Sequence, residues 1–446
     1  MLAFLTLLLE CLLLAILQAN GIAERPVGVI LVMIAAFSFV YFWEIGRSRK
    51  LRPVVLPLVL GYLMRLFLLL FDLYGRGIYI LPNSGTDSEG FYRRGLLYAQ
   101  EGLSQGGGFV SVIGTMFSWF GDTRIFVQFL LMLCSMIAIH MADVAMRELR
   151  VEDRQRKCAM YVLCLLPNFG ILSSIFLRES LVTMFISISL VCFIRWLNNS
   201  SDLWFLFAFL FAFAAARFHS GSVAVAAGYI VVRLLYNKKR GVFRLTWQSI
   251  IPAIFFMLVF VFLFNNYSDV LFGKMTGVDS LEDIANTSTV AGSSYAAYVG
   301  NSSTPLNMLL YTPLRLVFFL FSPFPWQWRG LSDIIAFCFS SMFYLLVFVR
   351  VTSYLRSRAQ KNRRVIIALL IVALVTAFVF AWGVVATGTA VRHRDKMVVL
   401  YAVLLGMTWK PEVRRPVRCK MKSPLKEGFE YEKYADHRSW ISYGGN

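Results

Sequence analysis

Twenty residues near the C-terminus read VIIALLIVALVTAFVFAWGV (residues 365–384), and none of them is charged. A helix of about 20 apolar residues is long enough to span the hydrocarbon core of a bilayer. Similar apolar runs recur along the chain, whose 446 residues are 58% hydrophobic and 15% charged, with a mean hydropathy of +0.65. This pattern predicts an all-α, polytopic integral membrane protein.

The formal net charge of +19 is concentrated in short segments between the apolar runs. These segments are 47–52, 147–157, 238–244, 350–364 and 410–422. Lys and Arg in short loops mark the cytoplasmic side of a membrane protein. We therefore interpret the charge as a topology signal and expect no nucleic-acid partner, because no RNA- or DNA-binding motif is present.

The seven cysteines form neither a ligand pattern nor a disulfide pattern. All except Cys419 fall within apolar runs, and none pairs with His at the spacing of a metal site. We expect them to be small apolar packing residues, and we expect no metal site and no cofactor.

Alternation of basic loops and apolar runs predicts about 12 crossings with both termini in the cytoplasm. Residues 1–409 would form one transmembrane domain with outer loops at about 73–108 and 265–330, and residues 410–446 would form a basic cytoplasmic tail. Pro167 and Gly170 are expected to break one crossing. The segment 308–330 is expected to dip in from the outer surface, because a full crossing would move the basic segment 350–364 outside.

Four arginine-bearing stretches share the outer face on this topology. They are Arg178-Glu179, Arg217-Phe218-His219, Arg315 and Arg392-His393-Arg394. An ionised side chain at membrane depth is costly and is usually kept for function, and Arg binds phosphate oxygens through paired donors. The stretches together predict a diphosphate site. Taken singly, each has a plainer interpretation as a local ion pair, an anchoring cation or a snorkelling side chain.

The outer loop also carries the best candidates for acid–base chemistry, in the sequence PNSGTDSEGFYRRG (residues 82–95). The turn residues lead to Asp87, which is able to cap the helix predicted to follow along the membrane interface. Asp87, or in second place Glu89 or His219, would accept the proton of a sugar hydroxyl. Tyr92 and Trp326 are candidate aromatic contacts for the substrate. The alternatives are that Asp87 only caps its helix, that Glu89 is solvated, and that the aromatic residues anchor the interface.

Four segments together resemble bacterial multi-pass proteins of surface-polysaccharide loci. They are GTDSEGFY (residues 85–92), FLRES (176–180), SPFPW (322–326) and TGTAVRHR (387–394). The proteins they resemble are Wzy-type O-antigen or exopolysaccharide polymerases and related GT-C-like membrane glycosyltransferases. The acidic loop resembles the GT-C pattern of an outer-loop Asp followed by Tyr and a helix, which implies Asp87 as the base. Arg217 and Gly228 match an Arg-to-Gly spacing associated with the Wzy-type proteins.

The resemblance implies a polymerase in the bacterial cytoplasmic (inner) membrane that joins polyprenyl-diphosphate-linked oligosaccharide units at the outer face. The lipid bilayer is then a partner, and a chain-length regulator is a further candidate partner. Two alternatives stay open, namely a transferase that adds one sugar from a polyprenyl-phosphate donor and a lipid-linked oligosaccharide flippase. The residues expected to hold the diphosphate or a lipid carrier are Arg178, Glu179, Arg217, Arg315, Arg392, His393 and Arg394.

Overall fold

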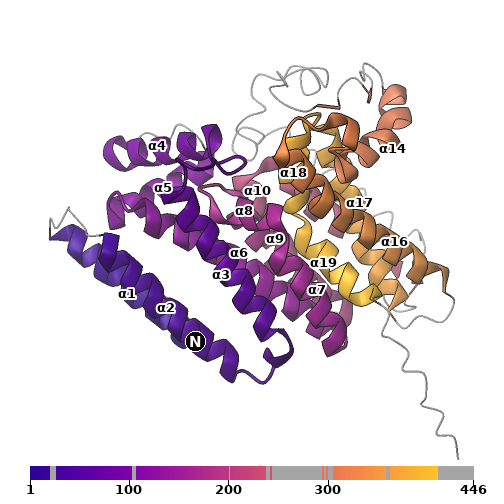
Figure 1. The fold of residues 1–446 in the computed structure, drawn as a ribbon. Helices are drawn as coiled ribbons and strands as arrows, with labels where there is room; N and C mark the ends of the chain where they lie inside the picture. Colours follow the sequence, from indigo (N-terminus) through magenta and orange to yellow (C-terminus); the bar gives the residue numbers. More distant parts are fainter. Residues whose placement is uncertain are drawn as a thin grey trace, which may run out of the picture. The chain divides into compact units, whose positions relative to one another are not determined.

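The fold comes from a computed structural model that describes residues 1–20, 27–102, 107–199, 201–237, 242–243, 294–295, 298–299, 305–357 and 362–409. Regular structure in these residues is helical (Figure 1) apart from two-residue strands, β1 (Tyr236–Asn237) and β2 (Val242–Phe243), which pair antiparallel. The predicted helical class is confirmed. One of the 12 predicted crossings falls at about 250–264, and it lies outside the described residues, as do most of the loop that follows it and the tail 410–446.

The first half of the chain forms eight α-helices and one short 3-10 helix in the described residues. They are α1 (Leu2–Ala19), α2 (Val27–Arg47), η1 (Arg52–Val54), α3 (Val55–Tyr74), α4 (Thr86–Glu101), α5 (Gly107–Phe120), α6 (Arg124–Glu148), α7 (Asp153–Leu165) and α8 (Pro167–Ser174). The helices of the second half are α9 (Glu179–Asn199), α10 (Asp202–Phe218), η2 (Ser220–Ser222), α11 (Val223–Leu235), α14 (Pro305–Phe321), η4 (Pro325–Gln327), α15 (Leu331–Ile335), the π-helical η5 (Ala336–Ser341), α16 (Met342–Arg356), α17 (Arg363–Trp382), α18 (Thr387–Asp395) and α19 (Val398–Thr408).

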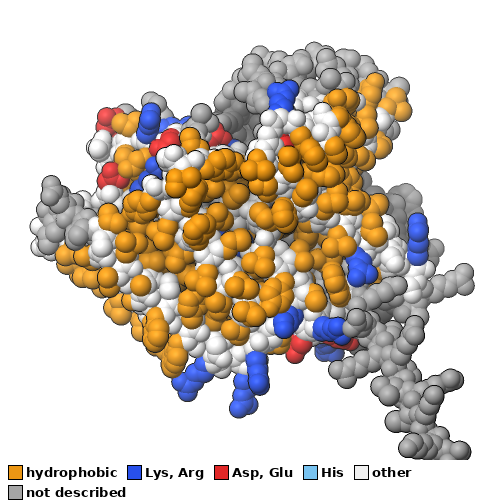
Figure 2. All heavy atoms as spheres, in the orientation of Figure 1, with side chains coloured by type: hydrophobic (Ala, Val, Ile, Leu, Met, Phe, Trp, Pro, Cys, Tyr) orange, Lys and Arg blue, Asp and Glu red, His pale blue; other side chains and the backbone are white. Residues whose placement is uncertain are grey.

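Seven helical spans in the described residues are long and apolar enough to cross a membrane, and an eighth is added if α7 and α8 form one bent span. The remaining apolar helices are shorter, and α11 and α19 have only 13 and 11 residues. Helix length therefore supports a multi-pass membrane protein but does not reach the expected count of 12. Figure 2 agrees, because hydrophobic side chains cover a broad band of the face shown while Lys and Arg gather along its lower edge.

The break expected at Pro167 is confirmed, since α7 and α8 meet at an angle of 56°. Proline has no N–H to donate, but it fits the first turn of α8. The buried Arg65 of α3 compensates at this break by donating to the carbonyl of Cys164 (2.8 Å) and to Ser173 Oγ (2.9 Å). A carbonyl freed within a membrane needs such a partner.

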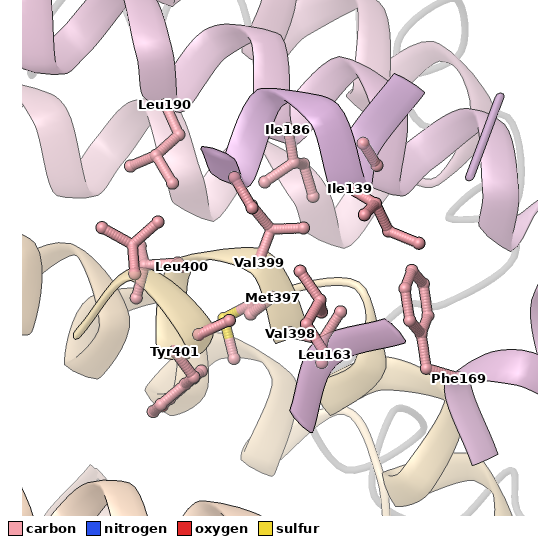
Figure 3. Close-up of a cluster of buried hydrophobic side chains, with 14 of the residues drawn as sticks. Ile139, Leu163, Phe169, Ile186, Leu190, Met397, Val398, Val399, Leu400 and Tyr401 are labelled. Carbon is pink, nitrogen blue, oxygen red and sulfur yellow. The ribbon is translucent and has the colours of Figure 1, made fainter. Parts of the chain in front are cut away.

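The core surrounds α19, every residue of which is buried. A helix that is apolar on all sides packs inside a bundle. Figure 3 shows the first residues of α19 and the preceding Met397 against Ile139 of α6, Leu163 of α7 and Ile186 and Leu190 of α9. The helix that precedes α19, α18, packs against α8, α14 and α17.

Charged networks mark both ends of α6. At one end Arg124 contacts Glu89, and at the other Asp143 accepts from Arg147 (2.9 Å) and Arg156 (2.8 Å). The helical rise separates Arg124 from Asp143 by roughly 28 Å. Asp143 is wholly buried, and Arg156 also donates to the carbonyl of Lys50 (3.1 Å), so this network ties α6 and α7 to the turn before α3.

We expect Asp143→Asn to lower the free energy of unfolding by about 3 kcal/mol, because it leaves Arg147 and Arg156 without their buried carboxylate. The matched control is Asp202→Asn, which weakens the ion pair with Arg233 but at a carboxylate that is 72% exposed, and its cost should stay below about 1 kcal/mol. Thermal unfolding in one detergent measures both. Equal losses in the two variants would contradict the structural role given to Asp143.

Candidate functional site

Side chains from four distant segments meet at one end of the helix bundle. Arg392 of α18 donates from Nε (3.2 Å) and Nη2 (2.8 Å) to Glu179 Oε1, and from Nη1 to Asp87 Oδ2. His393 lies with its Nε2 3.0 Å from Nε2 of His219. We call these residues, with Arg178 and Lys396, the α18 cluster; its members are Asp87, Arg178, Glu179, His219, Arg392, His393 and Lys396.

The helical repeat of α18 explains why this short element supplies so many members. Arg392 and Lys396 are four residues apart and therefore point to the same side of the turn. Lys396 Nζ lies 4.0 Å from Glu179 Oε1, the oxygen that Arg392 also contacts. Glu179 at the start of α9 thus meets two cations from α18.

Burial makes the balance of charge in the α18 cluster important. The exposed fractions of the side chains are 1% for Lys396, 5% for Glu179 and 13% for Arg392. Asp87 is 53% exposed and forms the outer edge. With Arg178 there are three basic groups and two carboxylates, so basic groups outnumber acidic ones in a poorly solvated place. Such a site attracts anions, because burial of unbalanced charge is costly.

Several polar atoms of the α18 cluster lack a hydrogen-bond partner among the described residues. They are Nζ of Lys396, Nε of Arg178, Oε2 of Glu179 and Nδ1 of His219. Burial lowers the pKa of Lys396 well below its usual range, and Arg178 and Arg392 act in the same direction, against Glu179. Burial also lowers the pKa of Arg178, an effect that Glu179 opposes and Arg392 strengthens. Additional negative charge would favour the protonated state of both groups.

Asp87 does not cap its helix as the sequence suggested. The N-cap of α4 is Gly85, and Asp87 lies within the first turn with its carboxylate on Arg392. The interfacial helix itself is confirmed as a helix. An acidic side chain in the first turn is favoured by the helix dipole, so the turn that presents Asp87 to α18 is also locally stable.

Glu89 lies in a different network from Asp87. Its two carboxylate oxygens accept from Nη1 (3.1 Å) and Nη2 (2.8 Å) of Arg124, and Arg76 donates to the same carboxylate. Burial raises the pKa of Glu89, but the hydrogen bonds from Arg124 and Arg76 outweigh it and hold the pKa below its usual range. Asp72 of α3 joins the network through Arg76 (3.3 Å). Glu89 therefore anchors α4 to α3 and α6, and it is not part of the α18 cluster.

The two aromatic candidates also lie outside the α18 cluster. Tyr92 donates to Asp122 (2.7 Å), and the guanidinium of Arg124 lies 4.7 Å from the centre of its ring. Trp326 is 64% exposed and stacks on Phe324 with ring centroids 4.8 Å apart. Tyr92 thus supports the Glu89 network, while Trp326 presents a flat aromatic surface elsewhere.

Three expected arginines are not brought to the α18 cluster. Arg394 is fully buried. It donates to the carbonyl of Leu320 (2.8 Å), near the end of α14, and to that of Ser322 (2.7 Å), directly after α14. Arg315 is buried with its guanidinium 4.2 Å from the centre of the Trp382 ring. Arg217 is exposed, and its guanidinium lies against Gly108. Arg394 and Arg315 hold α14 to the end of the bundle.

The Arg217–Gly228 spacing has a separate structural meaning at each end. Gly228 of α11 lies so close to α17 that an added Cβ would stand 2.9 Å from Cα of Val372. Glycine is needed there for close packing of two helices. Arg217 faces α5 instead, so the two residues do not form a common site in this structure.

Lys396 and the Asp72–Arg76–Arg124 network were missed from the sequence. Lys396 stands four residues after Arg392, and this helical spacing was a signal that pointed to it. Arg76 and Arg124 flank apolar runs and look like ordinary interfacial cations. No local pattern connects them to Glu89, because they come from different segments of the chain.

We expect Glu89→Gln to destabilise the protein by about 2 kcal/mol at pH 7, since two guanidinium groups lose their charged acceptor. The pKa of Glu89 is lowered by folding from an ordinary value of 4.5. Its carboxylate therefore stabilises the fold above pH 4.5, and this contribution disappears as the pH falls through the lower, folded-state pKa. Thermal unfolding of both proteins between pH 7 and pH 3 should show the difference shrinking below pH 4.5.

Glu101→Gln is the control, because Glu101 is exposed at the end of the same helix. A Glu89→Gln difference that stays constant down to pH 3, or that Glu101→Gln reproduces, would contradict the anchoring role.

Comparison with known proteins adds no relative: no model of a protein family, no curated protein and no solved structure matches this chain.

Proposed function

We propose that this protein is a membrane glycosyltransferase, specifically a surface-polysaccharide polymerase, that joins polyprenyl-diphosphate-linked oligosaccharide units at the outer face of the bacterial cytoplasmic membrane. The observation that carries the proposal is the α18 cluster, in which Arg178, Arg392 and Lys396 surround a pair of carboxylates. A diphosphate on a lipid carrier matches such a site, because its charge meets the cations while its tail stays in the bilayer.

In the proposed reaction, the diphosphate takes the place of carboxylates on Arg392. Asp87 and Glu179 are the groups that Arg392 contacts in the structure, and each is an oxyanion like a phosphate oxygen. The acceptor hydroxyl attacks the anomeric carbon, the bond to the diphosphate breaks, and the diphosphate leaves with the electron pair. Arg178, Arg392 and Lys396 stabilise the negative charge that develops, an electrostatic role that is often the largest catalytic contribution.

Arg315 and Arg394 have a supporting role in this proposal. They hold α14 near Trp382, the last residue of α17, and near η5. The sequence expectation gave them direct contact with the diphosphate, but their guanidinium groups lie in other contacts. We assign them to the frame that places α18, and we assign the phosphate contacts to the three cations of the α18 cluster.

The finer topology belongs to the same proposal. We place both termini in the cytoplasm and count about 12 crossings, with α10, α11 and α19 crossing as short helices. The network around Asp143 and the basic residues near Arg350 then face the cytoplasm, in keeping with the distribution of Lys and Arg. The α18 cluster faces outward. The segment with α14 dips in and returns, since both Thr312 and Ser322 contact the end of the bundle where α17 passes into α18.

A single-sugar transferase that uses a polyprenyl-phosphate donor is the nearest alternative, and it would use the same cations. A flippase is the alternative from another class. The charge distribution favours an enzyme over a flippase, because the members of the α18 cluster gather at one end of the described bundle. Product analysis with purified protein separates all three. A ladder of products indicates a polymerase, and a single added sugar indicates a transferase. If no glycan is formed, the protein is a transporter.

Cysteine labelling tests the sidedness. We expect Cys placed at Arg93 and Arg329 to react with a membrane-impermeant maleimide in intact cells, because both positions belong to the outward end. Cys at Arg49 and Arg154 should react only after permeabilisation. If Cys in place of Arg49 is labelled in intact cells and Cys in place of Arg93 is not, the orientation is the opposite one. That result would contradict the proposed reaction at the outer face.

Arg392→Ala is expected to reduce polymer formation by roughly 10- to 100-fold, since one guanidinium contact to a phosphate contributes about 1.5–3 kcal/mol. Lys396→Met should act in the same direction. Arg93→Ala is the matched control, because Arg93 is an exposed arginine on α4. Chain-length ladders from cells that contain equal amounts of membrane-inserted protein provide the measurement, and normal ladders from Arg392→Ala would overturn the function.

A further inference from the structure

We propose that Nδ1 of His219 is the base that accepts the proton of the acceptor hydroxyl, and that His393 holds His219 in the tautomer this requires. The inference rests on the proposed function and goes beyond it by assigning the proton transfer to a histidine pair. Two observations support it. The imidazoles of His219 and His393 are in contact, and Nδ1 of His219, on the other side of its ring, is buried without a partner among the described residues.

The hydrogen bonds of the pair determine where the protons lie when both imidazoles are neutral. His393 Nδ1 is 2.8 Å from the carbonyl oxygen of Thr389, which can only accept, so Nδ1 of His393 carries a proton. Nε2 of a neutral His393 is then an acceptor. His219 Nε2, 3.0 Å away, must donate to it. It follows that Nδ1 of His219 bears a lone pair and no proton.

Nδ1 of His219 is buried and has no hydrogen-bond partner among the described residues. A buried imidazole nitrogen usually finds a partner, so a bare one within the α18 cluster is a candidate for contact with substrate. Asp87, the other candidate base, is 53% exposed at the outer edge of the α18 cluster, so water solvates its carboxylate, whereas Nδ1 of His219 is buried.

Packing holds the two rings in this arrangement. Phe380 of α17 meets both imidazoles edge-on, with centroids 5.7 Å from His219 and 5.2 Å from His393. Gly221 leaves room for them, because a Cβ at this position would stand 2.7 Å from Phe380 Cε1 and 3.1 Å from His219 Cε1. A base needs such a fixed orientation, as proton transfer depends on geometry before it depends on pKa.

The cations around the histidine pair connect the proton affinity of His219 with binding of the diphosphate-linked sugar donor. Burial lowers the pKa of His219 well below its usual range, and Lys396, His393, Arg178 and Arg392 lower it further. Burial, Lys396 and Arg392 also lower the pKa of His393, while Thr389 and Glu179 act in the opposite direction. A diphosphate bound to these cations would cancel their field and raise the proton affinity of His219. The base then becomes effective when the donor is present.

In the proposed step, the acceptor hydroxyl loses its proton to His219 and replaces the diphosphate at the anomeric carbon. The acceptor oxygen forms its bond to the anomeric carbon, and its proton moves to Nδ1 of His219. The bond between the anomeric carbon and the diphosphate oxygen breaks, and the diphosphate leaves with the electron pair. The imidazolium of His219 then returns its proton to water or to the departing diphosphate, which restores the neutral pair.

Nitrogen NMR of the full-length protein in nanodiscs, labelled with ¹⁵N-histidine, tests the tautomers without any reaction. The chain has only four histidines, His140, His219, His393 and His437, so single variants assign the signals. We expect protonated Nε2 on His219 and protonated Nδ1 on His393. Farnesyl diphosphate, whose binding is followed by its ³¹P signal, should raise the titration midpoint of His219 by at least about one pH unit.

Two outcomes would overturn the inference: a proton on Nδ1 of neutral His219, or an unmoved midpoint when farnesyl diphosphate is bound. Failure of farnesyl diphosphate to bind at all would count against the proposed function as well.

Variants test the same point in the reaction. His219→Asn should lower kcat by 10²- to 10⁴-fold, with KM for the donor little changed. His393→Gln, whose side-chain oxygen accepts a hydrogen bond from His219, should retain much more activity than His393→Leu. Equal activities for His393→Gln and His393→Leu, or a normal kcat for His219→Asn, would remove the histidine base. If Arg392→Ala still reduced polymer formation by roughly 10- to 100-fold in that case, the proposed function would stand without the histidine base.

Discussion

The ion pair between Glu179 and Arg392 is the contact on which the arrangement of this end of the bundle depends. Its two residues are separated by 213 positions in the chain, and both are largely buried. Neither charge is tolerable alone in a poorly solvated place, so folding of α9 and of α18 is coupled through their need for each other. Asp87 extends the pair across α4, and Lys396 adds a second cation. Four segments that share no local sequence pattern are thereby drawn to one point.

Hydrophobic burial sets the place where that pair forms. Every residue of α19 is buried, and α19 packs against α6, α7 and α9, while α18 packs against α8, α14 and α17. Arg394 strengthens the constraint from the other side by satisfying carbonyls at the end of α14. The chemistry proposed for α18 therefore rests on a rigid apolar support, which is the usual means of holding reactive groups in a precise orientation.

Four arginines of the predicted stretches, Arg178, Arg315, Arg392 and Arg394, fall into two physical classes. Those with bonded donors, such as Arg394, and those on an aromatic face, such as Arg315, stabilise the fold. Arg178 has a buried nitrogen without a partner among the described residues, and Arg392 contacts only carboxylates of the kind a phosphate would replace. In the sequence these arginines look alike, because each is a cation near an apolar run. The distinction comes from the partners that tertiary structure provides, since a guanidinium held by backbone carbonyls has little left to offer a ligand.

Sequence by itself determined the helical class, the membrane character, the break at Pro167 and the presence of a helix at Asp87. Each of these depends on composition or on periodicity within a short window, which is local information. It also indicated Asp87, Arg178, Glu179, His219, Arg392 and His393, because ionisable groups stand out in apolar surroundings. Tertiary structure decided that these six meet, that Lys396 joins them and that Glu89 and Arg394 do not. The reason is that buried charges pair with residues hundreds of positions away in the chain, and a local sequence pattern does not indicate which distant residue the partner is.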